Sequence, residues 1–88
     1  MKIAFESRGW SDYQYWQSHD QKMVAKINAL IADARRSPFR GLGKPEPLKG
    51  DLKGWLSRRI DDEHRLIYRL IGTGNDQQIE VSQCRWHY

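Results

Sequence analysis

The sequence predicts an α+β fold with the element order β-α-α-β-β-β, in which two N-terminal helices pack on one face of an antiparallel sheet. Two patterns lead to this prediction. Apolar residues recur at helical spacing between residues 7 and 36, and three strand-like runs rich in apolar residues follow residue 54. A chain of 88 residues is also short for more than one domain, so we expect residues 1–88 to form a single domain.

The first strand and the first helix are predicted from short local signals. Ile3 and Phe5 alternate with neighbours that are charged or small, which is typical of a short strand. Ser7 is a suitable N-cap for the helix that follows. That helix carries three aromatic residues at three-residue spacing, namely Trp10, Tyr13 and Trp16.

The second helix is the clearest element in the sequence. Asp20 is expected to cap its N-terminus. Ser37-Pro38 is expected to end it, because proline disfavours helical geometry in the preceding residue. The apolar residues that fall on one face of this helix are Met23, Val24, Ile27, Leu30, Ile31 and Ala34.

Residues 38–54 are predicted to form a long connection, since they contain three prolines and four glycines. Connections of this length in a compact domain are often functional. Three strands are predicted after it, over residues 55–60, 65–71 and 79–86. With the helices on one face of the sheet, the other face is available for charged and aromatic side chains.

The net charge of +4 is concentrated in one part of the chain. Residues 35–69 contain ten of the fifteen basic residues and five of the eleven acidic ones, so this segment carries +5. A charged segment is often only a solvated surface. Its concentration on consecutive elements of a small basic protein favours a polyanionic partner instead.

Several function classes fit the sequence poorly. The single cysteine, Cys84, excludes an intrachain disulfide, and we expect it to pack as a small apolar residue. The histidines at positions 19, 64 and 87 lack the spacing of metal ligands, so we expect neither a metal nor a cofactor. The sequence shows no signal peptide and no membrane span, so we expect a cytoplasmic protein.

Glu46 is the first candidate catalytic residue. It stands between Pro45 and Pro47, which restrict the backbone and would present the carboxylate at a fixed point. Lys44 and Lys49 flank this segment, and nearby positive charge favours the ionised carboxylate. The alternative is a loop glutamate without a special role.

Arginines on the predicted strands are the next candidates. Arg58 and Arg59 are adjacent and therefore point to opposite faces of the sheet. Alternation around the hairpin places Arg59, rather than Arg58, on the face of Arg65. The alternative is that Arg58 and Arg59 are both solvated surface side chains.

The sequence finishes with Trp86-His87-Tyr88, which predicts a final segment docked against the body of the protein, since unattached ends are usually polar. His87 is the candidate there, because imidazole changes charge near neutral pH. Strand alternation would place Cys84 on the face opposite His87 and would make Trp86 a packing residue. The alternative is an aromatic end that serves only the core.

Together these residue types suit metal-free cleavage of RNA. Glu46 can take the proton of a 2′-hydroxyl, and His87 can protonate the departing 5′-oxygen. Cations for the phosphate are available in Arg65, Arg59 and Lys49. Aromatic side chains that can stack on a base are Trp55, Trp86 and Tyr88.

Long motifs spread over the chain match those of a known family. They are Trp10-Ser11-Asp12-Tyr13, Lys26-Ile27-Asn28, Gly43-Lys44-Pro45-Glu46-Pro47-Leu48-Lys49, Ser57-Arg58-Arg59-Ile60, Glu63-His64-Arg65-Leu66-Ile67-Tyr68 and His87-Tyr88. On these motifs the chain resembles the YoeB group of the RelE family, the toxins of bacterial toxin–antitoxin systems. Segments that depart from the family pattern are Arg8-Gly9, Arg40-Gly41-Leu42, Gly50-Asp51 and Trp86. They remove no catalytic group and leave the base preference open.

The resemblance implies a RelE-like microbial RNase fold and a toxin that cleaves mRNA in the ribosomal A site. It implies Glu46 as the general base and His87 as the general acid, with Arg65 in contact with the transition state. Further phosphate and RNA contacts implied by the family pattern are Arg59, Lys49 and Tyr88. We expect Lys44, which lies two residues before Glu46 in the sequence, to contact RNA as well.

The resemblance also implies partners. They are the ribosome with its mRNA and a YefM-like antitoxin, whose acidic C-terminal segment would cover the basic surface. Operator DNA would be bound only through the toxin–antitoxin complex, and no membrane partner is expected. The exposed aromatic residues are compatible with a homodimer. Two alternatives stay open, a non-catalytic module that binds RNA or the ribosome and a module that serves mainly to bind the antitoxin.

Overall fold

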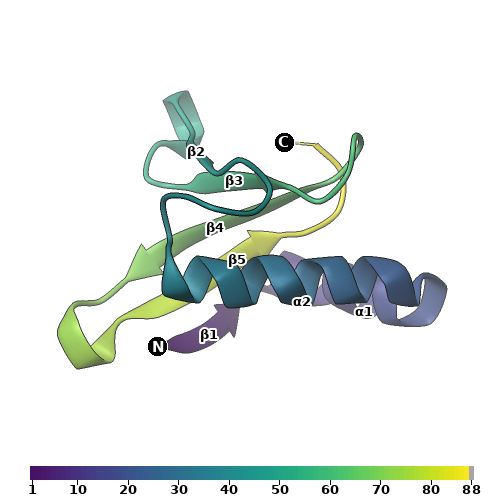
Figure 1. Ribbon diagram of the computed structural model, residues 1–88, viewed down its shortest axis with the longest axis horizontal. Helices are drawn as coiled ribbons and strands as arrows, with labels where there is room; N and C mark the ends of the chain where they lie inside the picture. The colour runs from purple at the N-terminus through teal and green to yellow at the C-terminus, as the bar shows by residue number, and fades with distance from the viewer. Residues whose placement is uncertain (88) are drawn as a thin grey trace.

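Two helices and a five-stranded sheet make up the described residues, 1–87, of the computed structural model (Figure 1). The elements, in chain order, are β1 (Lys2–Phe5), α1 (Ser7–His19), α2 (Gln21–Arg36), β2 (Glu46–Pro47), the 3₁₀ turn η1 (Gly50–Leu52), β3 (Leu56–Arg59), β4 (Arg65–Ile71), the 3₁₀ turn η2 (Gly74–Asp76) and β5 (Gln78–Gln83). The predicted α+β class, with both helices before the main run of strands, is confirmed.

The sheet differs from the prediction in two ways. Its strand order is β1-β5-β4-β3-β2, and β1 runs parallel to β5 while the other neighbours are antiparallel. The chain between β1 and β5 passes through all the other elements, so no short hairpin forces these two strands to be antiparallel. In addition, Glu46 and Pro47 form an edge strand inside the predicted connection. A two-residue strand is too short to show alternation, and proline is tolerated at an edge.

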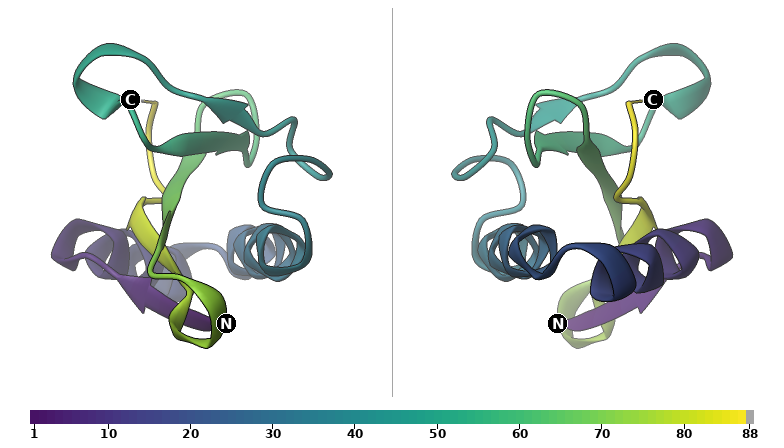
Figure 2. Two further views of the ribbon diagram at one scale, coloured as in Figure 1. Left: turned by 90° about the vertical axis from the view of Figure 1, so that its left-hand side faces the viewer. Right: turned by 90° about the vertical axis from the view of Figure 1, so that its right-hand side faces the viewer.

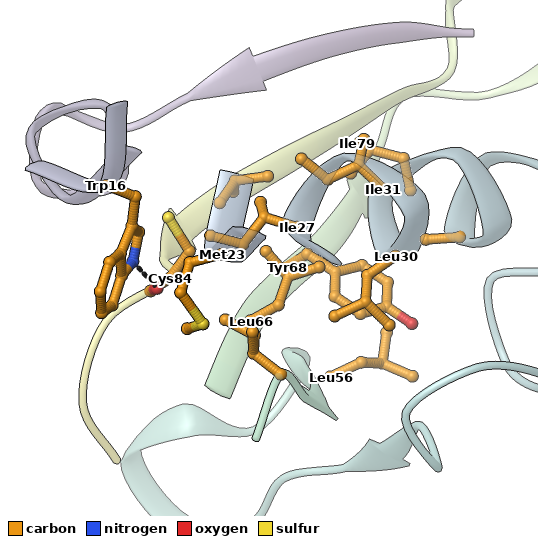
Figure 3. Close-up of a cluster of buried hydrophobic side chains, with 13 residues drawn as sticks. Trp16, Met23, Ile27, Leu30, Ile31, Leu56, Leu66, Tyr68, Ile79 and Cys84 are labelled. Carbon is orange, nitrogen blue, oxygen red and sulfur yellow. Dashed lines mark hydrogen bonds between the residues drawn. The ribbon is translucent and has the colours of Figure 1, made fainter. Parts of the chain in front are cut away.

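Helices α1 and α2 contact each other, and both lie below β2 and β3 in the two views of Figure 2. The apolar stripe of α2 packs against residues of β3, β4 and β5, as the close-up of the core shows (Figure 3). The core members are Trp16, Met23, Ile27, Leu30, Ile31, Ala34, Leu56, Ile60, Leu66, Tyr68, Ile79, Val81 and Cys84. Every member of the stripe predicted for α2 belongs to this core or packs against it. The face of β3 and β4 that points away from this core is therefore available for polar and charged side chains.

The predicted helix ends are only partly correct. The Asp20 carboxylate accepts hydrogen bonds from the N–H groups of Lys22 and Met23, so its capping role is confirmed. Ser7 is wrong as an N-cap, because it is already helical and Glu6 occupies the cap position without a side-chain bond. The helix α2 ends at Arg36, directly before the predicted Ser37-Pro38 stop.

Helix α1 crosses close to β5 at Gly9. A Cβ atom at this position would lie 2.6 Å from the Val81 carbonyl oxygen, well inside van der Waals contact. Only glycine therefore allows α1 to approach the strand this closely. The close approach brings Asp12 and Trp16 of α1 within hydrogen-bond distance of Cys84.

Strand β5 ends at Gln83, three residues earlier than predicted. The reason lies in α1, whose side chains take both backbone groups of Cys84. The Cys84 N–H donates to Asp12 Oδ2 at 3.1 Å, and the Trp16 indole N–H donates to the Cys84 carbonyl at 2.9 Å. Strand alternation stops at this point, so the assignment of Trp86 to packing is wrong, and its side chain is 49% exposed.

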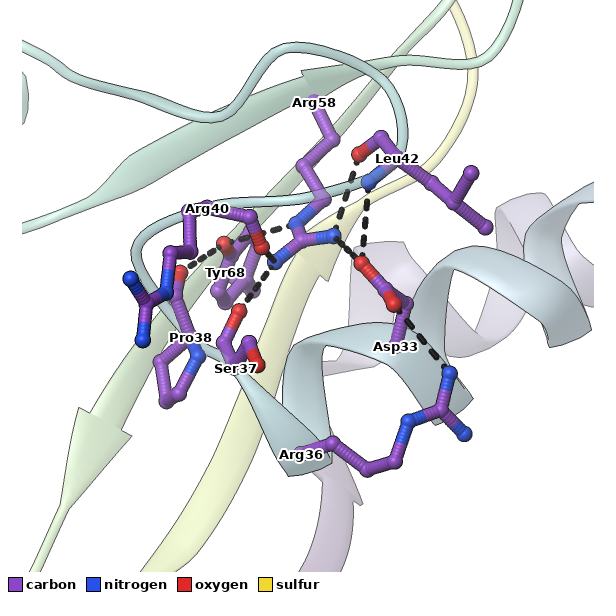
Figure 4. A network of polar contacts seen from close by, with 8 residues as sticks. All are labelled: Asp33, Arg36, Ser37, Pro38, Arg40, Leu42, Arg58 and Tyr68. Atoms are coloured by element: carbon purple, nitrogen blue, oxygen red, sulfur yellow. Dashed lines mark hydrogen bonds and ion pairs between the residues drawn. The ribbon is translucent and has the colours of Figure 1, made fainter.

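The connection after α2 is anchored by a buried guanidinium group, that of Arg58 (Figure 4). Arg58 is fully buried, which corrects the alternative that Arg58 and Arg59 are both solvated. An arginine has five N–H donors, and each of them meets an acceptor here. The acceptors are Tyr68 Oη at 2.9 Å, Asp33 Oδ2 at 2.6 Å, and the carbonyls of Leu42 at 3.0 Å, Ser37 at 2.6 Å and Arg40 at 3.1 Å.

This arrangement ties three parts of the chain together. Asp33 belongs to α2, Tyr68 belongs to β4, and the three carbonyls belong to the connection. Asp33 also accepts a bond from the Leu42 N–H at 2.9 Å, and Tyr68 donates to the Pro38 carbonyl. The first part of the connection is thus held in place although it contains no helix or strand.

We expect Arg58→Ala to destabilise the protein by at least about 2 kcal/mol, because five buried or partly buried acceptors would lose their donor. Chemical denaturation followed by circular dichroism measures this change. Arg36→Ala is the matched control, since Arg36 also contacts Asp33, at 3.1 Å, but its side chain is largely exposed. A loss of stability in the control as large as in Arg58→Ala would contradict the special role of Arg58.

Acid stability should depend on Asp33. Its hydrogen bond from Arg58, followed by that from the Leu42 N–H, holds the pKa of this carboxyl below its ordinary value of 3.8. A lowered native pKa stabilises the fold above the unfolded pKa, and this stability is lost as the pH falls through the native value. We therefore expect Asp33→Asn to be less stable at neutral pH but to lose less stability below about pH 4. Equal acid slopes in denaturation series of the two proteins would refute this.

Candidate active site

Five of the residues predicted for the site line one open cavity of about 280 Å³. The lining residues are Lys44, Glu46, Ser57, Arg59, Arg65 and His87. They come from the connection, from β2, β3 and β4, and from the C-terminal segment. The structure thus brings together side chains that are up to 43 positions apart in the sequence.

Strand register places these side chains on one face. Glu46 pairs with Ser57, and Arg59 pairs with Arg65. Residues two apart on a strand share a face, so Ser57 and Arg59 point the same way. Leu56, one residue earlier, belongs to the core beneath the helices. The cavity therefore lies on the face of β3 and β4 away from the helices, and Arg59 rather than Arg58 shares the face of Arg65, as predicted.

The segment before Glu46 is held tightly against β3. The Gly43 carbonyl accepts a hydrogen bond from the Arg59 N–H at 2.7 Å. Gly43 has a φ of +77°, and a Cβ atom there would lie 2.8 Å from the Arg59 carbonyl oxygen. Lys44 follows with a φ of +51°, a left-handed conformation that is uncommon for a residue other than glycine. The Gly43–Arg59 hydrogen bond and the two positive φ angles together place Lys44 and Glu46 at the cavity.

The two arginines of the cavity differ in how firmly they are held. Arg65 Nη1 donates to the carbonyls of Asp61 at 2.7 Å and His64 at 3.0 Å, so its guanidinium has a defined orientation. Arg59 pairs with Asp62 at 3.0 Å, but the Asp62 side chain is almost fully exposed. Such an exposed ion pair is weak. Arg59 can exchange this partner for a bound anion at little energetic cost.

His87 reaches the cavity from a short irregular segment after β5. Figures 1 and 2 show this segment turning away from the helices, toward the end of the sheet that holds β2 and β3. Trp86, the residue before His87, is fixed through both backbone groups. Its N–H donates to His64 Nδ1 at 2.7 Å, and its carbonyl accepts from the Arg65 N–H at 3.0 Å. The prediction that this end docks against the protein is confirmed for the described residues.

The chemical character of the cavity is cationic with a single carboxylate. Lys44, Arg59 and Arg65 bring positive charge to a space that also contains Glu46 and His87. Guanidinium groups match phosphate oxygens, and a carboxylate with an imidazole can exchange protons with a substrate. Among residues 1–87, no three His, Cys, Asp or Glu side chains gather as a metal site. The arrangement can therefore bind a phosphodiester and transfer protons around it.

Of the predicted site residues that the structure describes, Lys49 does not belong to this cavity lining. Lys49 is exposed and precedes the 3₁₀ turn η1, which leads the chain away from Glu46. Tyr88 lies outside the residues that the structure describes. Ser57 and His64 were not recognised from the sequence. The alternation Ser57–Arg59 on one strand could have indicated Ser57, whereas nothing local indicates that the His64 ring contacts Trp86.

Cys84 is buried in the core, in agreement with the prediction that it packs as a small apolar residue. Burial raises the pKa of its thiol to about 12, with a further contribution from the nearby Asp12 carboxylate. A thiol of this kind is protonated at neutral pH and is a poor nucleophile. The reactive groups of the site are therefore those that line the cavity.

Comparison with known proteins identifies the family. The model of the YoeB-like toxin of bacterial type II toxin–antitoxin systems matches residues 5–88. The chain belongs to the YoeB family. The resemblance stated from the sequence motifs is thereby confirmed. Toxin YoeB of Streptomyces coelicolor is 54% identical over the full length of both chains.

Solved structures of YoeB proteins share this fold. A YoeB/ParE toxin from Agrobacterium tumefaciens is 57% identical, with a TM-score of 0.96 and full coverage of both chains. A YoeB dimer from Staphylococcus aureus is 44% identical, with a TM-score of 0.86, and the match covers 100% of this chain and 98% of that one. The toxin in a heterotetrameric YoeB–YefM complex from the same species is 43% identical, with a TM-score of 0.87 and the same coverage.

No helix within residues 1–87 is both long and apolar enough to cross a membrane.

Proposed function

We propose that this YoeB-family toxin is a ribosome-dependent mRNA endonuclease that cleaves mRNA in the ribosomal A site without a metal ion. One observation carries the proposal, namely that Glu46, His87 and three cationic side chains line the same cavity. The reaction needs a base, an acid and a counter-charge for the phosphorane, and the cavity contains each of these groups. Cleavage of mRNA during translation would inhibit protein synthesis.

The proposed reaction is an internal transfer at phosphorus. Glu46 takes the proton of a 2′-hydroxyl, and the 2′-oxygen attacks the adjacent phosphorus. The bond from phosphorus to the 5′-oxygen breaks, and His87 gives that oxygen its proton. The products are a 2′,3′-cyclic phosphate and a 5′-hydroxyl end. One proton is taken up and one is delivered, so no cofactor is consumed.

The cationic residues have separate tasks in this proposal. Arg65, oriented by its two carbonyl contacts, stabilises the negative charge that grows on the phosphorane. Arg59 and Lys44 hold the non-bridging oxygens and the neighbouring backbone. Lys49, which is exposed beyond the cavity, is assigned to a phosphate further along the RNA. We assign Tyr88 to the same substrate from the family pattern alone.

The proposed partners follow from the family and the charge. The S. aureus relative is found with YefM, so we propose that a YefM-like antitoxin with an acidic segment covers the basic surface of this chain as well. Operator binding would occur only through that complex. The S. aureus relative also forms a dimer, and we propose the same state for this chain. A cytoplasmic location suits these partners.

Purified protein added to translating ribosomes should cut mRNA within the reading frame, and cutting should persist in EDTA at concentrations that leave ribosomes intact. Primer extension locates the cuts, and end labelling should reveal 2′,3′-cyclic phosphate and 5′-hydroxyl ends. Inhibition by EDTA with intact ribosomes would contradict the metal-free reaction. Glu46→Gln and His87→Ala should each lower the cleavage rate at least about 100-fold. Unchanged growth inhibition by both variants would favour the non-catalytic RNA-binding alternative instead.

Deleting the last two residues should abolish cleavage and leave the fold largely intact. The deletion removes His87 and Tyr88 but keeps the Trp86 backbone contacts with His64 and Arg65. Thermal unfolding and the cleavage assay, performed on the same preparation, separate these two effects. A truncated protein with full activity would refute the role of His87.

A further inference from the structure

His64 has no role in the chemistry described so far, yet it touches the segment that carries His87. Its side chain is buried, 8% exposed, within the turn that joins β3 to β4. Its Nδ1 atom accepts the Trp86 N–H at 2.7 Å. Because a neutral imidazole can accept at only one nitrogen, this bond places the ring proton on Nε2. Trp86 is the residue directly before His87.

The His64 ring is itself held from several sides. The core residue Trp16 makes an edge contact with it, with ring centroids 4.8 Å apart, and the Trp86 ring lies 5.4 Å away. The backbone N–H of His64 donates to Asp61 Oδ1 at 2.8 Å, and the backbone carbonyl of His64 accepts from the Ile60 N–H at 3.0 Å. Trp16 thus holds the ring, and Asp61 and Ile60 hold the backbone of His64, independently of the contact with Trp86.

Trp86 needs such support. Its φ is +69°, a left-handed conformation that a bulky residue rarely adopts unless neighbouring contacts impose it. The imposed conformation turns the chain so that His87 reaches the cavity beside Arg65. Two contacts hold the Trp86 backbone, and the one on its N–H comes from the His64 side chain.

We propose that His64 is a positioning residue for His87. This role rests on the proposed function, in which His87 is the proton donor. His64 Nδ1 fixes the Trp86 backbone and thereby orients the His87 imidazole toward the departing 5′-oxygen. Loss of the acceptor would leave substrate binding intact and would misplace the proton donor. A misplacement of about 1 Å at a reacting group can lower a rate about 100-fold.

Three variants test this in the ribosome assay. His64→Leu removes the acceptor and keeps an apolar side chain of similar bulk. His64→Asn keeps an acceptor, because its amide oxygen can take the position of Nδ1. His19→Leu is the matched control, since His19 is exposed at the end of α1 and its Nδ1 lies 2.7 Å from the Tyr15 carbonyl of the same helix. Each protein is compared on two mRNAs.

The second mRNA carries sulfur in place of the 5′-oxygen at the cleaved linkage. A thiolate leaves without protonation, so this substrate does not need the proton from His87. On the ordinary mRNA we expect His64→Leu to lower kcat about 100-fold with KM within about threefold of the wild type. On the sulfur substrate we expect His64→Leu and His87→Ala to approach the wild-type rate. His64→Asn should retain most activity, and His19→Leu should match the wild type on both mRNAs.

The two substrates are cut by the same preparation, so the ratio of their rates is independent of any unfolded fraction. Equal losses on both substrates would show that His64 is only structural and would overturn the inference, as would full activity of His64→Leu on the ordinary mRNA. If the wild type itself cuts neither mRNA, the proposed function fails and the inference fails with it.

Discussion

The burial of one guanidinium group is the constraint on which the rest of this structure depends. Arg58 is fully buried, and removing a charge from water is tolerated only where hydrogen bonds replace the lost hydration. All five of its donors are used, and their acceptors belong to α2, β4 and the connection after α2. The connection is long, rich in proline and glycine, and otherwise without regular structure between Ser37 and Leu42. Its path is thus set by a side chain of the sheet.

The candidate active site takes residues from two irregular segments, one in the middle of the chain and one near its C-terminus. The segment with Lys44 and Glu46 is held by Arg58 and by the backbone of β3, and the segment with His87 is held by His64 and the backbone of β4. Each contains a residue other than glycine with a positive φ, Lys44 in the first and Trp86 in the second. Sparsely populated backbone conformations persist only where the surroundings impose them, and they concentrate at functional sites. Proton transfer requires this kind of rigid placement.

The residues that stabilise the fold and the residues of the candidate site lie on opposite faces of the sheet. The helix-facing side of β3, β4 and β5 carries the apolar core, the buried Arg58 and an unreactive Cys84 thiol. The opposite face of β3 and β4 carries Arg59 and Arg65, and within residues 1–87 Arg59 forms a weak ion pair with the exposed Asp62. The alternation of Arg58 and Arg59 along one strand thus gives two adjacent arginines opposite uses, one structural and one available to a polyanion.

Local sequence determined the α+β class, both helices, the main strands and the inward and outward faces of β3 and β4, because helical and strand periodicity are properties of neighbouring residues. The residues that line the cavity, apart from Ser57, were also recognisable as chemical types. Tertiary structure alone decided that Arg58 is buried, that β5 ends at Gln83 and that Trp86 is exposed. Each of these depends on a partner distant in sequence, such as Asp33 for Arg58, or Asp12 and Trp16 for the backbone of Cys84. Alternation along a strand cannot anticipate a hydrogen bond from another element that ends the strand.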